Sequence, residues 1–245
     1  MYRTNVDFAA GRRHTAAMSR SKQTRTNNAG RPTAAEIRRP LQQRNRERFD
    51  SILDGAERLL ERFEPHQISI HKIAAEIGIS APSIYHFFPE TSFIFAALAE
   101  RYLLLFQQRV GEGRLARFTT WQDLQTHQFQ RARDYYNTHA AVRKVLLGPA
   151  YSFDVRSRDL DSNTILAAKS IEVMNRLFEV PDLPDLVERW VEIIVIGDAL
   201  WSLSIHRYGT ITDEMEEQAR RARIAYTRTF LPEYLPRKRD SSGKQ

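Results

Sequence analysis

Histidine is the residue type with which this sequence could most readily assemble a metal or acid–base site. The seven histidines are scattered, and neither an HExxH pair nor a phosphate-cradling glycine loop occurs. His66 and His71, for example, lie five residues apart across an expected helix boundary. The absence of cysteine excludes disulfides, thiolate zinc sites and a cysteine nucleophile. We therefore expect no catalytic residue, no metal site and no cofactor, and a protein that is not an enzyme.

The segment from residue 69 to residue 91 concentrates hydroxyl and ring side chains on a pattern of two short helices. Its sequence is SIHKIAAEIGISAPSIYHFFPET. Ser69 suits the N-cap of a helix over 70–77, and Gly78 suits its end because glycine adopts a positive φ at low cost. Ser80 suits the cap of a further short helix that ends at Pro89.

The apolar residues of this segment predict which of its faces is buried. A set at helical spacing would fill the wedge against the preceding helix, with Ala74 at the crossing: Ile70, Ile73, Ile77, Ile79, Ile84 and Phe87. The outward residues of the second short helix in this segment would then be Ala81, Pro82, Ser83, Tyr85 and His86. This small, polar face with two hydrogen-bonding rings suits a nucleic-acid groove. The alternative is an ordinary helical hairpin in a packed domain.

Apolar residues at steps of three and four predict helices along the rest of the chain. One helix is expected from residue 41 to Pro65, and a long one from residue 90 to the glycines at 111 and 113. The pattern shows neither strand-like alternation nor an internal repeat, so the sequence predicts an all-α protein of about nine helices. The remaining helices are expected over residues 120–138, 140–147, 160–178, 183–208 and 212–231.

Charge and composition divide the chain into segments. Residues 1–40 hold nine Lys and Arg against two acidic residues, so this segment carries a net charge of +7, as does the whole chain. We interpret it as a basic disordered arm that suits a polyanionic partner, or alternatively as a solvated extension or start-site artefact. Residues 41–90 would be a helix-turn-helix domain, 91–236 a helical domain and 237–245 a disordered tail.

Membrane association is not expected. No apolar run reaches the roughly 18 residues that span a bilayer, and the N-terminus has no apolar core of the signal-peptide type. We expect a cytoplasmic protein.

The pattern of the segment 69–91 resembles the TetR family of transcriptional regulators. The resemblance covers about fifty residues, from Arg44 to Leu98, whereas the C-terminal part resembles the family only in the number, length and spacing of its helices. It implies a homodimeric regulator, usually a repressor, that binds a near-palindromic double-stranded DNA operator and leaves it when an apolar or aromatic small-molecule effector binds. The matching residues are Ser69-Ile70-x-x-Ile73-Ala74, Gly78-Ile79-Ser80 and Ile84-Tyr85-x-x-Phe88-Pro89.

The resemblance also implies roles for single residues. Ser69 and Tyr85 would hold backbone phosphates, and Ser80 would lie beside them. Thr91 stands where the family often has a phosphate-gripping lysine, and it offers only a hydroxyl and the helix N-terminus. Base edges or nearby phosphates would face Ala81, Pro82, Ser83 and His86.

The charge of the helix-turn-helix domain is a second departure from what DNA binding requires. Residues 41–90 hold six basic against eight acidic residues, a net charge of −2. DNA affinity then depends on help from the arm or on where four basic residues lie, namely Arg44, Arg46, Arg48 and Lys72.

The C-terminal helical domain is rich in aromatic residues, for which the resemblance implies an effector pocket. We expect its walls to include Trp121, Tyr136, Tyr151 and Trp190, and the alternative is that these rings are core or interface.

The last two helices have apolar stripes that predict a dimer seam. The alternative is that both helices close the core of a single chain. The expected seam residues are Ile194, Gly197, Trp201, Ile205, Ala222 and Tyr226.

Two other functions remain alternatives to a transcriptional regulator. One is an enzyme or ligand carrier with an aromatic cavity, and the other is an architectural or RNA-binding protein driven by the arm.

Overall fold

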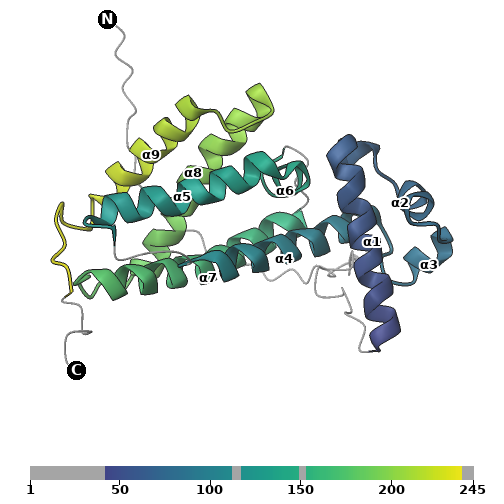
Figure 1. Ribbon diagram of the computed structural model, residues 1–245, viewed down its shortest axis with the longest axis horizontal. Helices are drawn as coiled ribbons and strands as arrows, with labels where there is room; N and C mark the ends of the chain where they lie inside the picture. Colours follow the sequence, from purple (N-terminus) through teal and green to yellow (C-terminus); the bar gives the residue numbers. More distant parts are fainter. Residues whose placement is uncertain (1–41, 112–116, 149–152, 239–245) are drawn as a thin grey trace, which may run out of the picture. The chain divides into compact units, whose positions relative to one another are not determined.

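The computed structural model describes residues 42–111, 117–148 and 153–238, with the backbone alone for 153–158. In these ranges the chain is all-α, as predicted, with nine α-helices and a short 3-10 turn over Pro65–Gln67 (Figure 1). The arm over 1–40, most of the tail and Tyr151 lie outside the described residues. The helices are α1 (Gln43–Arg62), α2 (Ile70–Ile77), α3 (Ala81–Tyr85), α4 (Thr91–Arg109), α5 (Trp121–Thr138), α6 (Ala140–Leu146), α7 (Phe153–Leu177), α8 (Leu186–Tyr208) and α9 (Asp213–Thr227).

The predicted helix bounds hold within a few residues except at α7. This helix begins at Phe153, seven residues before the predicted start at residue 160. The intervening sequence, FDVRSRD, is rich in charged residues and gives no apolar period to follow. Helix α9 ends at Thr227 rather than at residue 231, and the chain continues in turns that bring the Leu231 amide to the Thr227 carbonyl oxygen.

Helices α1, α2 and α3 form the expected three-helix unit. Gly78 ends α2 in the left-handed region, with φ of 68°, as the sequence predicts. Of the expected wedge residues, Ile77, Ile79 and Phe87 are only partly buried. The fully buried members of the unit's core include Ile52, Leu53, Ile70, Ile73, Ile84 and Phe88.

Helices α1 and α2 approach each other closely at Gly55. A Cβ atom there would lie 2.3 Å from Cγ2 of Ile77, a separation that real Cβ atoms essentially never show. Ala74, which the sequence places at the helix crossing, is buried as well. The residue that sets the distance between the two helices is nevertheless the glycine on α1.

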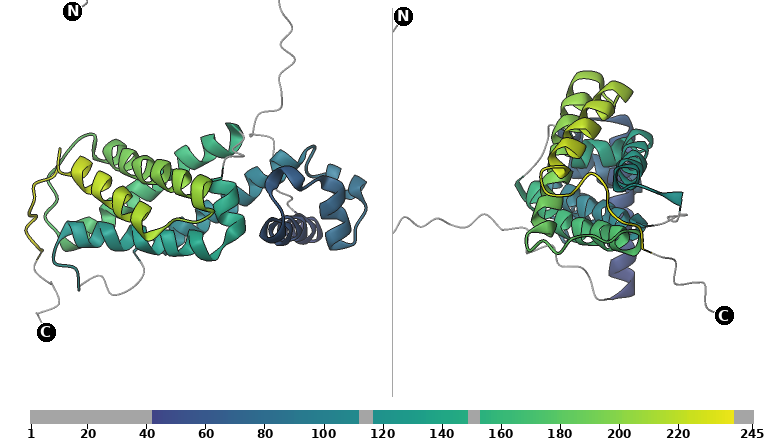
Figure 2. Two further views of the ribbon diagram at one scale, coloured as in Figure 1. Left: turned by 90° about the horizontal axis from the view of Figure 1, so that it is seen from above. Right: turned by 90° about the vertical axis from the view of Figure 1, so that its left-hand side faces the viewer.

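The C-terminal helices pack around α8. This helix packs against α9 and α7, and α7 packs in turn against α4. Both views in Figure 2 show α8 and α9 lying side by side. Among the described helices none is both long and apolar enough to cross a membrane.

Two helices outside the three-helix unit hold α1. From α4, the Arg101 guanidinium bonds to the Asp54 carboxylate at 2.6 Å and to that of Asp50 at 3.3 Å. From α6, the Lys144 ammonium donates to the carbonyl oxygens of Leu60 at 2.8 Å and Phe63 at 3.0 Å. A cation at the C-terminal end of a helix stabilises the carbonyl groups that lack a partner within the helix.

We predict that Gly55→Val destabilises the protein. The added side chain must displace Ile77, and overpacking of this kind costs about 1–3 kcal/mol of the free energy of unfolding. Urea denaturation measures this change, with Ser51→Val, an exposed position on the same helix, as the matched control. Equal stability of the two variants would show that α1 and α2 do not depend on the glycine.

Candidate functional site

The outward face of α3 carries the residues that the sequence assigns to it. Pro82, Tyr85 and His86 are exposed, and Tyr85 is 47 % exposed despite its size. Ala81 and Ser83 are half-buried, and the hydroxyl of Ser83 lies 2.9 Å from that of Ser80. A short helix whose buried side is anchored by Ile84 thus presents two ring side chains and a proline to solvent.

Ser69 is the N-cap of α2, as predicted. Its hydroxyl oxygen accepts a hydrogen bond from the Lys72 backbone N–H at 3.3 Å. Because the oxygen is the acceptor, the hydroxyl hydrogen stays available to donate to an anion. The neighbouring ring of Tyr85 is packed edge-on against His71, with 6.4 Å between the ring centroids.

The basic side chains of the helix-turn-helix unit are not all directed outward. The Lys72 ammonium lies 3.1 Å from the ring centroid of Phe63, so it packs against the end of α1. Arg58 and Arg62 both bind Glu76, and the Arg62 hydrogen bond chiefly lowers the pKa of that carboxyl. No pattern in the sequence indicates these pairings.

Arg44 and Arg46 occupy the other end of α1. Both are exposed near the start of the helix, so their guanidinium groups are available to bind phosphates.

Thr91 is the first residue of α4. Its N-cap is Glu90, whose carboxylate accepts from the Ser92 hydroxyl at 3.3 Å. An acidic side chain at this helix end opposes a phosphate there, because both compete for the same partial positive charge. The start of α4 thus has Thr91 in place of the lysine expected from the resemblance, and it carries the Glu90 carboxylate as well.

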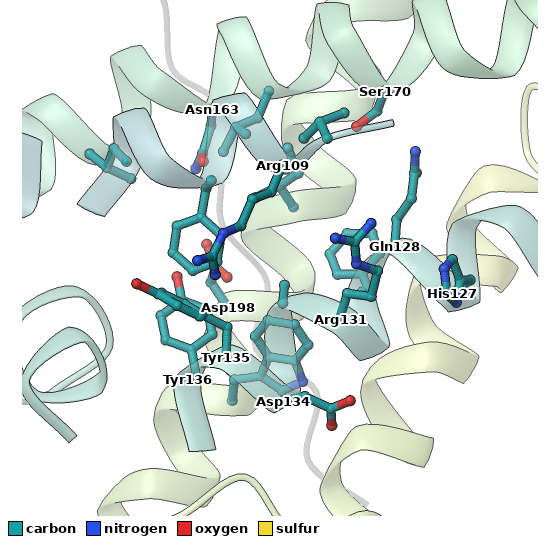
Figure 3. A pocket seen from close by; sticks show the side chains of 18 of the residues that line it. Arg109, His127, Gln128, Arg131, Asp134, Tyr135, Tyr136, Asn163, Ser170 and Asp198 are labelled. Carbon is teal, nitrogen blue, oxygen red and sulfur yellow. The ribbon is translucent and has the colours of Figure 1, made fainter. Parts of the chain in front are cut away.

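A cavity of about 420 Å³ lies between α4, α5, α7 and α8 (Figure 3). Tyr136 and Trp190, two of the expected wall residues, line it. Arg109 from α4 also contributes, and its guanidinium carbon lies 4.5 Å from the ring centroid of Tyr135. The further aromatic wall residues are Phe106, Phe129 and Trp201.

Trp121 is not a wall residue of this cavity, contrary to the sequence expectation. It is buried at the start of α5, where its indole N–H donates to the Pro232 carbonyl oxygen at 3.0 Å. Periodicity marks such a ring as inward-facing but does not say which neighbour fills the inside. The wall residues that the sequence missed include polar ones, such as Gln128 and Asn163, because a polar residue in a helix normally indicates a solvated face.

Two residues expected in the dimer seam lie inside one chain instead. A Cβ atom at Gly197 would lie 3.1 Å from Nη1 of Arg223 and 3.4 Å from the Phe129 ring. Trp201 is 1 % exposed, and its indole N–H donates to Glu216 at 2.7 Å. The close approach that Gly197 permits is therefore to α9 and α5 of the same chain, which corrects the expectation for both residues.

The other expected seam residues divide between two positions. Ile194 lines the cavity, whereas Ile205, Ala222 and Tyr226 are half-buried. The Tyr226 hydroxyl donates to the Glu192 carboxylate, which joins α9 to the outer side of α8.

Helix α8 carries a second apolar stripe, on the side away from the cavity. Val195, Ala199 and Leu203 recur at steps of four, Ile196 lies three residues before Ala199, and each of the four is exposed or half-buried. A helix that is apolar on both sides is normally buried on both. The sequence contains this second stripe, but the other face of the helix carries the larger apolar residues Trp190 and Trp201, and the seam is therefore predicted there.

Comparison with known proteins agrees with this architecture. Residues 52–98 match the family model described as bacterial regulatory proteins, tetR family. No curated protein sequence matches the chain at a significant level.

Solved structures of low sequence identity share the fold. A TetR transcriptional regulator from Rhodococcus sp. RHA1 has a TM-score of 0.57 at 15% identity, covering 74% of this chain and 96% of its own. A TetR-family regulator from Streptomyces coelicolor has 0.54 at 19% identity, covering 74% and 98%. SmeT, the repressor of the Stenotrophomonas maltophilia multidrug efflux pump SmeDEF, has a TM-score of 0.52 at 17% identity. The match covers 77% of this chain and 93% of SmeT.

Proposed function

We propose that the chain is a dimeric, DNA-binding transcriptional repressor of the TetR type, which a small molecule in the cavity releases from its operator. The observation that carries this proposal concerns α4. This helix supplies Phe106 and Arg109 to the cavity wall and Arg101 to the ion pairs that hold α1. A ligand that moves the wall must therefore move a helix that is bonded to the helix-turn-helix unit.

In this proposal α3 enters the major groove of a DNA half-site. The hydroxyls of Ser69 and Tyr85 donate to phosphates, and His86 with Ser83 reaches base edges. Lys72 contributes less than its charge suggests, because its ammonium is held at the Phe63 ring. Arg44 and Arg46 then place positive charge at the start of α1, and the arm over residues 1–40 supplies the net positive charge that the unit lacks.

The release step is a shift between two conformations. A ligand that binds one state more tightly than the other moves the population toward that state by the difference in binding free energy. Helix α6 takes part because Lys144 and the amide of Ala141, which donates to Glu61 at 3.2 Å, hold the end of α1. We propose repression rather than activation because SmeT, which shares the fold, is named as a repressor.

Two copies of the chain pair through the outer faces of α8 and α9 in this proposal. The stripe at Val195, Ala199 and Leu203 is apolar, and a two-fold axis along it would bury the same patch on both chains. Each copy then presents one α3 to each half of a near-palindromic operator.

We predict that changes on α3 separate affinity from sequence preference. Tyr85→Phe should weaken binding to all DNA sequences alike, because a phosphate contact carries no base information. His86→Ala should cost about 1–3 kcal/mol at the preferred site or change the preferred bases. Selection of binding sites from random double-stranded DNA measures both effects, with Gln130→Ala on α5 as a control. An unchanged preferred sequence after His86 and Ser83 are both replaced would contradict recognition by α3.

We also predict that Ala199→Arg yields a folded monomer that binds the operator weakly, because a charge would lie in the apolar seam. Gly197→Arg should instead reduce the free energy of unfolding by about 1–3 kcal/mol or more, since the new side chain meets the buried Arg223. Light scattering and urea denaturation together distinguish the two outcomes, with Gln130→Arg as a surface control. A native protein that is monomeric at micromolar concentration would rule out the dimer.

A further inference from the structure

Two buried amide nitrogens on the cavity wall lack a hydrogen-bond partner in the described part of the chain. The side-chain nitrogens Nδ2 of Asn163 and Nε2 of Gln128 are inaccessible to solvent and have no acceptor in the described part of the chain. Asn163 is 2 % exposed and comes from α7, whereas Gln128 comes from α5. Figure 3 shows both side chains among the residues that line the same cavity.

Unpartnered buried donors of this kind require an explanation. Most buried polar groups in folded proteins are hydrogen-bonded, and a donor left without an acceptor destabilises the state that contains it. A bound molecule that supplies acceptors removes this penalty, so the two amides favour a ligand with carbonyl, ether or ring-nitrogen acceptors.

Several charged groups around the cavity are already engaged, and the Asp134 carboxylate is exposed to solvent. The Arg109 guanidinium lies over the Tyr135 ring, and the Asp198 carboxylate interacts electrostatically with the buried Arg223. Asp159 and Arg131 each interact with another group as well. A charged ligand would need a counterion that these groups do not offer, because burying an unpaired charge is costly.

Much of the remaining wall is aromatic. Phe106, Tyr136, Trp190 and Trp201 surround a space that suits a flat ring, since aromatic pairs gain from edge and offset contacts beyond the area that they bury.

We propose that the cavity takes an uncharged aromatic molecule with hydrogen-bond acceptors, to which Asn163 and Gln128 donate. This inference rests on the proposed function in taking the cavity as the effector site. It goes further in excluding organic anions and cations as preferred ligands, and in assigning polar recognition to two named side chains.

Four naphthalenes of matched ring size test the proposal by isothermal titration calorimetry with the full chain and no DNA. They are 2-methylnaphthalene, 2-acetylnaphthalene, 2-naphthoate and 2-naphthylmethylammonium. We expect the neutral acetyl probe to bind most tightly, with a Kd about tenfold below that of the methyl probe.

Variants of equal size remove the donors. Asn163→Leu and Gln128→Met should each abolish most of the preference for the acetyl probe while leaving the methyl probe as tightly bound. The matched controls are Asn175→Leu and Gln130→Met, which change the same residue types on the same helices but outside the cavity wall. The controls should retain the preference. Asn163→Leu should melt no lower than the parent protein, because it removes an unpartnered buried amide.

Tightest binding of the naphthoate or of the ammonium probe, equal binding of all four, or no binding of the acetyl probe would each overturn the inference. So would an unchanged preference in both cavity variants. The proposed function is tested separately by adding the acetyl probe to the protein–operator complex. Binding with the predicted preference but without DNA release would contradict the release mechanism and leave the ligand class standing.

Discussion

In the proposed release mechanism, the coupling between the cavity and the helix-turn-helix unit depends on the C-terminal end of α1. The Lys144 ammonium binds two carbonyl oxygens there, and the Ala141 amide binds the Glu61 carboxylate. Arg101 adds a bond from α4 to the acidic side of the same helix. These contacts replace water at a helix end whose carbonyls lack partners within the helix, so α4 and α6 are attached to α1 by specific bonds rather than by apolar packing alone. A change in the position of either helix is transmitted to the unit that carries α3.

The packing around the cavity limits where that change can begin. Its back wall is supported by the buried pair Arg223–Glu216, whose guanidinium also lies 3.9 Å from the Phe129 ring centroid. Burial lowers the pKa of Arg223 while the Glu216 carboxylate opposes that shift, and breaking such a pair would leave an uncompensated charge in the core. In the proposed mechanism the α8–α9 side therefore keeps its position when a ligand binds, and the α4 and α7 side, where Arg109 is exposed, is the side that responds.

The sequence predicted most of the fold and one face of the site. Local signals suffice at Gly78, where a positive φ is required, and at Ser69, where a hydroxyl caps a helix. They fail where a tertiary neighbour decides, since Gly197 and Trp201 follow the spacing of a seam but face Arg223 and Glu216 of their own chain. Asn163 could not be found at all, because nothing in its local sequence distinguishes a polar cavity wall from a solvated helix face.

The central claim is that filling the cavity changes the spacing of the two α3 helices in the dimer. The chain has no cysteine, so Ala75→Cys, at an exposed position on α2, gives a single nitroxide label in each copy. Pulsed electron–electron double resonance then measures the distance between the two labels. It is recorded in the operator complex and in protein saturated with a compound that calorimetry shows to bind the cavity. The account predicts one narrow distance on DNA and a different mean distance with the compound bound. An identical distance distribution in both states, with DNA released nonetheless, would contradict it.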